Sequence, residues 1–204
     1  MSATIYPATT SEYVPRLCIG LARQFRSAVH AENEQMAEFL IHATKPIRAR
    51  LDRKPSLRPD HFELLRQAWD SMPQKYRLAN EATGNHKHFR FNEARLFPAD
   101  VVKETWSEQG VAIQLNVLNW RSGELQHHVQ PLVLVSLHAL GRWFERSGSN
   151  DADRLLLDLK PLIYADQKAK RVPCGSGTWI AELVTADRDG TSDHVLRIKT
   201  FIEL

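Results

Sequence analysis

Apolar residues recur at spacings of three and four between residues 12 and 42, the pattern of an amphipathic helix. The positions are Val14, Leu17, Leu21, Phe25, Ala28, Val29, Met36, Phe39 and Leu40. The charged run at residues 32–34 is a candidate break in this helix. We expect the helix to end at Lys45-Pro46, because the residue before a proline is pushed out of the helical region.

A second helix is predicted after Asp60, a residue type that caps helix N-termini well. It carries apolar residues at helical spacing, and Pro73 is expected to end or kink it. These residues are Phe62, Leu64, Leu65 and Trp69.

Beyond Gly84 the hydrophobic period changes from that of a helix to that of a strand. Residues 88–92 and 111–120 alternate between apolar and polar side chains, as half-buried strands do. A turn at residues 121–123 leads to a return strand at 125–135, in which Pro131 marks an edge or a bulge.

Two short helices and a hairpin complete the chain. Ser136 can cap a helix over residues 137–146, and Gly148 can end it. Asn150 or Asp151 opens the next helix, which closes before Pro161. Residues 178–185 and 194–202 are the arms of a terminal hairpin.

These elements predict an α+β fold, in which a helical N-terminal part precedes a mostly antiparallel sheet with two inserted helices. A soft boundary near Gly84 divides the chain into a helical region, 1–84, and a sheet region, 85–204. The helices either form a domain of their own or pack on the sheet as one integrated domain.

The composition is that of an ordinary globular protein. Of 204 residues, 43% are hydrophobic and 25% are charged. No apolar stretch reaches the roughly 20 residues of a membrane span, and the first ten residues lack a signal-peptide pattern. We therefore expect a soluble cytoplasmic protein without membrane contact. Cys18 and Cys174 are expected to be reduced thiols, with a disulfide between them left open.

The charge distribution is more informative than the net charge of +3. Residues 45–95 contain twelve Lys or Arg and six Asp or Glu, a net of +6. Such a basic segment favours a polyanionic partner, and the alternative is a solvated loop and helix face. The candidate nucleic-acid-binding residues are Arg48, Arg50, Arg53, Lys54, Arg58, Lys87 and Arg90. Aromatic residues at Phe89 and Phe91 could stack bases or belong to the core.

A row of three basic side chains lies in the predicted helix at 137–146. His138, Arg142 and Arg146 are four residues apart and form one stripe, opposite Leu140 and Phe144. Stacked cations favour a bound anion such as a phosphate, and a histidine can act as a general acid or base. The alternative is a solvated face that Glu145 and nearby acids compensate.

The motif His138-Ala-x-x-Arg142-x-x-x-Arg146 resembles a signature of small bacterial proteins related to the BrnT and RelE endoribonuclease toxins. The resemblance covers residues 132–204 and implies RNA cleavage without metal or cofactor. It implies His138 as base or acid, and Arg142, Arg146, Arg197 and Lys199 as electrostatic stabilisers. It also implies RNA rather than DNA as substrate, and a homo-oligomer or an antitoxin-like protein as partner.

Other chemistry finds less support in the sequence. The pairs His86/His88 and His127/His128 lack companion ligands at a recognisable spacing, so no metal site is predicted. Residues 175–177 read as a turn, and Cys174 lacks an identifiable partner as a nucleophile. The leading hypothesis is a toxin-like endoribonuclease of a defence or mobile-element system. The alternatives are a non-catalytic nucleic-acid-binding regulator and a protein-interaction scaffold.

Overall fold

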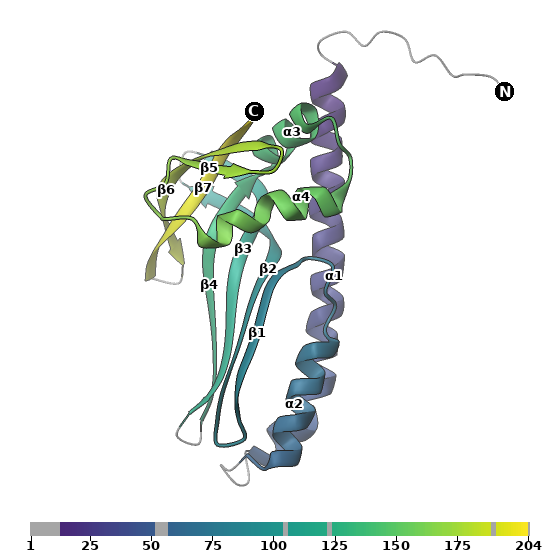
Figure 1. Cartoon of the computed structure of the whole chain (residues 1–204), viewed down its shortest axis with the longest axis vertical. Helices are drawn as coiled ribbons and strands as arrows, with labels where there is room; N and C mark the ends of the chain where they lie inside the picture. Colours follow the sequence, from purple (N-terminus) through teal and green to yellow (C-terminus); the bar gives the residue numbers. More distant parts are fainter. Residues whose placement is uncertain (1–12, 52–56, 104–105, 122–123, 189–190, 204) are drawn as a thin grey trace, which may run out of the picture.

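The computed structural model describes residues 13–51, 57–103, 106–121, 124–188 and 191–203. The fold is α+β, as predicted (Figure 1). The elements in chain order are α1 (Tyr13–Leu51), α2 (Pro59–Ser71), β1 (Arg77–Asn85), β2 (His88–Lys103), β3 (Trp106–Arg121), β4 (Glu124–Ser136), α3 (Leu137–Ser147), α4 (Ala152–Leu159), the 3₁₀ helix η1 (Lys160–Tyr164), β5 (Arg171–Cys174), β6 (Gly177–Arg188) and β7 (Thr191–Glu203).

The strands form one seven-stranded sheet in the order β1-β2-β3-β4-β7-β6-β5. Neighbours are antiparallel except β4 and β7, which pair in parallel through residues 133–135 and 196–198. The four strands β1 to β4 are long and extend toward one end of the molecule (Figure 1). The smaller group β5 to β7 lies toward the other end, beside α3.

Helix α1 is a single helix of 39 residues, so the expected break at residues 32–34 and the expected end at Pro46 are both wrong. Glu32 pairs with Arg95 at 3.1 Å, and the Asn33 amide donates to the Leu96 carbonyl at 2.9 Å. The polar run therefore attaches the helix to the sheet. Pro46 removes one backbone donor, but the turns before it are already fixed by Met36 and Phe39 in a hydrophobic cluster, and extending a formed helix costs less than starting one.

The helix caps follow the sequence signals in α3 and depart from them in α2. Ser136 accepts from the Ala139 amide at 3.1 Å, and Gly148 ends α3 in the left-handed region at φ 60°. In α2 the N-cap is Arg58 rather than Asp60. Pro59 takes the first helical position, because a backbone N–H at that position would have no partner within the helix and its absence costs nothing. The N-cap of α2 therefore lies two residues before Asp60.

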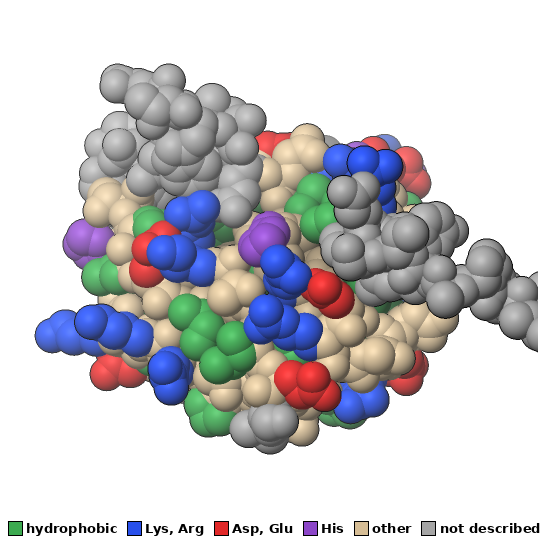
Figure 2. All heavy atoms as spheres, turned by 90° about the horizontal axis from the view of Figure 1, so that it is seen from above, with side chains coloured by type: hydrophobic (Ala, Val, Ile, Leu, Met, Phe, Trp, Pro, Cys, Tyr) green, Lys and Arg blue, Asp and Glu red, His purple; other side chains and the backbone are tan. Residues whose placement is uncertain are grey.

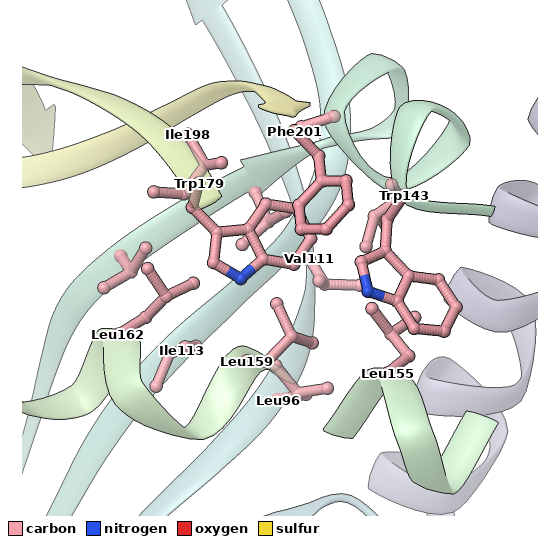
Figure 3. Packing of buried hydrophobic residues seen from close by; sticks show 14 of the residues in the cluster. Leu96, Val111, Ile113, Trp143, Leu155, Leu159, Leu162, Trp179, Ile198 and Phe201 are labelled. Atoms are coloured by element: carbon pink, nitrogen blue, oxygen red, sulfur yellow. The ribbon is translucent and has the colours of Figure 1, made fainter. Parts of the chain in front are cut away.

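The main core lies where α1, α3 and α4 meet the sheet (Figure 3). Trp179 and Phe201 lie edge to face with ring centroids 4.8 Å apart, and Trp143 lies beside Leu155. Asp158 serves both indoles, because its carboxylate accepts from Trp143 at 2.8 Å and its carbonyl accepts from Trp179 at 2.7 Å. Both buried indole N–H groups are therefore satisfied.

A second, aromatic core joins α1 and α2 to the start of β2 and the end of β3. Phe62 of α2 lies 5.5 Å from Phe89, and Trp69 lies 5.3 Å from Phe91, measured between ring centroids. This core fixes the start of α2 next to the β1–β2 turn.

A buried ion network connects α1 to the sheet. Arg95 is fully buried and contacts Glu93 at 2.9 Å and Glu32 at 3.1 Å. Arg77 of β1 reaches the same Glu93 at 2.7 Å, and Arg95 also donates to the Pro73 carbonyl. One buried guanidinium thus joins α1, the α2–β1 connection and β2.

The predicted boundary near Gly84 falls inside the β1–β2 hairpin. The main core draws residues from both sides of that position, including Phe25 of α1 and Ile198 of β7. This arrangement favours the integrated domain over a separate helical one.

Loss of Arg95 should destabilise the protein far more than loss of Arg90, an exposed residue on the same strand. Arg95→Ala removes the guanidinium partner of Glu32 and leaves Glu93 with Arg77 alone, and removing one member of a buried ion pair costs about 3–5 kcal/mol. Arg90→Ala should change the free energy of unfolding by no more than about 0.5 kcal/mol. Urea denaturation followed by circular dichroism measures both, and equal small changes would contradict this role for the network.

Candidate functional site

The structure describes five of the seven basic residues that the sequence singled out between positions 45 and 90, and these five lie at one end of the molecule. The last turns of α1, the start of α2 and the β1–β2 turn meet there (Figure 1). We call Arg48, Arg50, Arg58, Lys87 and Arg90 the basic end. The backbone of Arg48 and Arg50 belongs to α1, and the other three residues are exposed. Arg53 and Lys54 lie outside the described residues.

The cations of the basic end differ in how far they are neutralised. Arg58 pairs with Asp60 at 2.7 Å, and this pairing holds the pKa of Asp60 at about 2. Arg90 donates to the Asn92 side chain at 2.9 Å, and no carboxylate among the described residues pairs with it. In the described part of the chain, Lys87 has no carboxylate partner. Lys87 and Arg90 are therefore the cations best placed to meet an anion here.

Much of the remaining charge excess of residues 45–95 is internal or paired. Arg77 and Arg95 are buried against Glu93, and Arg66 lies between Glu63 at 2.8 Å and Asp70 at 3.2 Å. Besides Arg66, the exposed cations of this segment that lie outside the basic end, in the described ranges, are Lys45 and Lys75.

Phe89 and Phe91 do not offer a stacking surface for bases. They are 3% and 1% exposed and belong to the aromatic core. The sequence left two alternatives open for these rings, base stacking and a place in the core. The structure supports a place in the core.

Helix α3 presents its predicted faces. Leu140 and Phe144 are buried, whereas His138 is exposed. Arg142 pairs with Glu145 at 2.6 Å, and half-buried Arg146 donates to the Phe201 carbonyl. The expected row of three stacked cations is therefore partly neutralised by a carboxylate and tied to β7 by a backbone contact.

Arg197 and Lys199 lie on one face of β7, as the alternation predicted. Both contact Glu182 of β6, at 2.9 Å and 3.2 Å. Lys199 occupies a bulge in the β6–β7 ladder, where the register shifts between Ile180 and Ala181. Basic and acidic side chains are interspersed over this end of the molecule (Figure 2).

A groove of about 430 Å³ runs along the edge of β6, beside the loop that leads into β5. Basic side chains line it from both sides, with one acid, Glu182, among the lining residues. These basic residues are Lys168, Lys170, Arg171 and Lys199. The first three were not predicted as site residues, although the run Lys-Ala-Lys-Arg at 168–171 is a visible signal in the sequence.

The predicted catalytic residues do not converge in this groove. Lys199 lines it, but His138, Arg142 and Arg146 do not. The basic end lies far from this groove, because α1 runs along the molecule from one end to the other and a helix of 39 residues is roughly 60 Å long. The catalytic and nucleic-acid-binding sets therefore form separate surfaces.

Burial makes the two thiols poor nucleophiles. Burial and the carboxylate of Asp158 raise the pKa of the Cys174 thiol to about 11, and burial also raises the pKa of Cys18. Both are free thiols. Across the described residues, no group of three or more His, Cys, Asp or Glu side chains is arranged to hold a metal ion.

Comparisons with protein-family models, with curated proteins and with solved structures found no match. The resemblance of residues 132–204 to the endoribonuclease toxins stays a prediction. No helix in the described ranges is long and apolar enough to cross a membrane.

Alkylation should report the raised pKa of Cys174. A thiol with a pKa of about 11 holds about 100-fold less thiolate at pH 8 than one at its ordinary value of 9.0. Iodoacetamide should therefore modify Cys174 at least that much more slowly in the native protein than in urea, and the native rate should rise with pH up to about 11. Peptide mass spectrometry separates Cys174 from Cys18, and equal native and unfolded rates would contradict the assignment.

Proposed function

We propose that the protein binds nucleic acid through phosphate contacts at the basic end. The observation that supports this most is the placement of exposed Arg58, Lys87 and Arg90 at one end of the fold, beside the last turns of α1. Lys87 and Arg90 are exposed there without a carboxylate partner among the described residues. The proposal includes a preference for RNA over DNA, which rests on the resemblance to the endoribonuclease toxins. It also includes a cytosolic location, which the free thiols support.

The physical basis of binding is charge neutralisation and counterion release. An arginine such as Arg90 can donate two parallel hydrogen bonds to a phosphate, whereas Lys87 acts as a point charge. Because Phe89 and Phe91 are buried, base stacking by these rings is not part of the interface. We therefore expect binding with little sequence preference and a strong dependence on salt.

Charge reversal at the basic end should weaken binding and flatten its salt dependence. The double variant Lys87→Glu/Arg90→Glu should bind single-stranded RNA at least about tenfold more weakly at low salt. The slope of log K against log salt should become shallower by about 0.7 for each phosphate that the variant no longer neutralises. Arg154→Glu/Lys160→Glu, which reverses two exposed cations on α4 and η1, is the control with the same change in net charge and should match the parent protein. Fluorescence anisotropy at several salt concentrations gives both quantities.

Two results would contradict nucleic-acid binding at the basic end. One is the absence of RNA and DNA binding by the parent protein at low salt. The other is an equal weakening in Lys87→Glu/Arg90→Glu and in Arg154→Glu/Lys160→Glu, because net charge rather than placement would then explain binding.

Ribonucleolysis is the second candidate function, and the exposure of His138 favours it. The ring lies on the solvent side of α3, one turn before Arg142, where a phosphate could compete with Glu145 for the guanidinium. A positioned general acid or base contributes about 10²–10⁴ in rate.

If the protein cleaves RNA, His138→Ala should reduce the rate by that factor while RNA binding at the basic end persists. The free energy of unfolding should change by no more than about 0.5 kcal/mol, because the ring fills no core space. His42→Ala, an exposed histidine of α1, is the matched control. Gel analysis of labelled RNA measures cleavage, and full activity of the His138 variant would remove this candidate.

A further inference from the structure

Strand β6 has an open edge along half of its length. On the side of β5, pairing ends where the Ala181 amide donates to the Lys170 carbonyl at 3.0 Å. Beyond Ala181, β6 continues to Arg188 with β7 as its only strand neighbour within the described ranges. An unpaired strand edge is a template for a further strand.

The backbone groups on that edge can be identified by alternation. In an antiparallel ladder, every second residue directs both its N–H and its C=O to the same side. Ala181 directs its N–H toward the β5 side, so Leu183 and Thr185 do the same. Their N–H and C=O groups form a donor–acceptor row next to the groove, whereas Glu182 and Val184 serve the β7 ladder.

The groove beside this edge carries uncompensated positive charge. Lys168, Lys170 and Arg171 are exposed, and no carboxylate in the described part of the chain pairs with their side chains. Glu182 already contacts Arg197 and Lys199, so it compensates none of these three. An occupant must therefore bring its own negative charge.

Apolar surface completes the groove. Ile180, Ala169 and Leu183 line it, and Leu183 is 44% exposed. Side chains of an added strand point alternately to the two faces of the sheet, so an occupant can place apolar residues on one face and acidic residues on the other.

We propose that an acidic, extended segment of a partner protein adds to the β6 edge as a further strand. Its backbone pairs with Leu183 and Thr185, and its carboxylates meet Lys168, Lys170 and Arg171. This site is separate from the basic end and does not depend on nucleic-acid binding.

Two other occupants fit less well. A phosphodiester chain carries acceptors for the cations but leaves the carbonyls of Leu183 and Thr185 without donors. A second copy, paired through the same edge, would bring its own Lys168, Lys170 and Arg171 and so add positive charge to this edge. An acidic peptide satisfies both the backbone row and the charge.

The test uses the full chain and a fluorescein-labelled peptide of about ten residues that alternates Glu with Val, with a Lys-Val peptide as control. Leu183→Pro removes the outward N–H yet should be tolerated, because proline occurs on strand edges that face solvent. Leu183→Ala shortens the same side chain and keeps the N–H. Lys168→Glu/Lys170→Glu removes the charge match.

The proposal predicts that the acidic peptide binds and the basic peptide does not. The double lysine variant should bind at least about tenfold more weakly than the parent protein. Leu183→Pro should bind at least about tenfold more weakly than Leu183→Ala, because both variants shorten the side chain and only the proline removes the N–H. In the parent protein, hydrogen exchange of the Leu183 and Thr185 amides should slow on adding the peptide, a readout that needs no variant to fold.

Three results would overturn the proposal: no binding of the acidic peptide, equal affinities of Leu183→Pro and Leu183→Ala, or unchanged amide exchange. Binding of a short poly(U) RNA that the lysine variant abolishes and Leu183→Pro keeps would assign the groove to nucleic acid instead. Concentration-dependent dimerisation that Leu183→Pro abolishes would assign it to a second copy.

Discussion

The fold depends on the burial of Arg95 between α1 and the sheet. This guanidinium reaches Glu32 on α1, Glu93 on its own strand and the Pro73 carbonyl before β1. A buried network of this kind adds little net stability over apolar packing, but it becomes very costly when one member is removed. It therefore fixes how α1, α2 and the β1–β2 hairpin are placed relative to one another, and that placement creates the basic end.

The length of α1 then decides how the candidate sites are distributed. Its first half packs with α3 in the main core, and Met36 joins the aromatic core with α2. The basic end and the β6 groove consequently lie at opposite ends, and α3 contributes no lining residue to the groove. A nucleic acid at one end and a peptide at the other could be bound at the same time.

Local signals in the sequence were sufficient for several elements. Ser136 and Gly148 bracket α3 because a hydroxyl cap and a left-handed glycine act within one turn. Strand β1 was missed because its exposed positions carry no apolar alternation, and α1 was cut too short because Pro46 outweighed packing partners that are remote in sequence. The pairing of Arg142 with Glu145 follows an (i, i+3) spacing that is visible in the sequence, and it matches the alternative of a compensated helix face. The groove at Lys168–Arg171 lies at a sheet edge, which no local pattern specifies.

The central claim is that nucleic acid meets this protein at the basic end, and the most direct test maps backbone amide shifts. Isotope-labelled protein is titrated with a single-stranded RNA of about twelve nucleotides and followed by two-dimensional NMR. The account predicts shifts at the β1–β2 turn around Lys87 and Arg90 and in the last turns of α1, with Lys168 to Arg171 unchanged. Shifts confined to α3 or to the β6 groove, or no shifts at all, would contradict it.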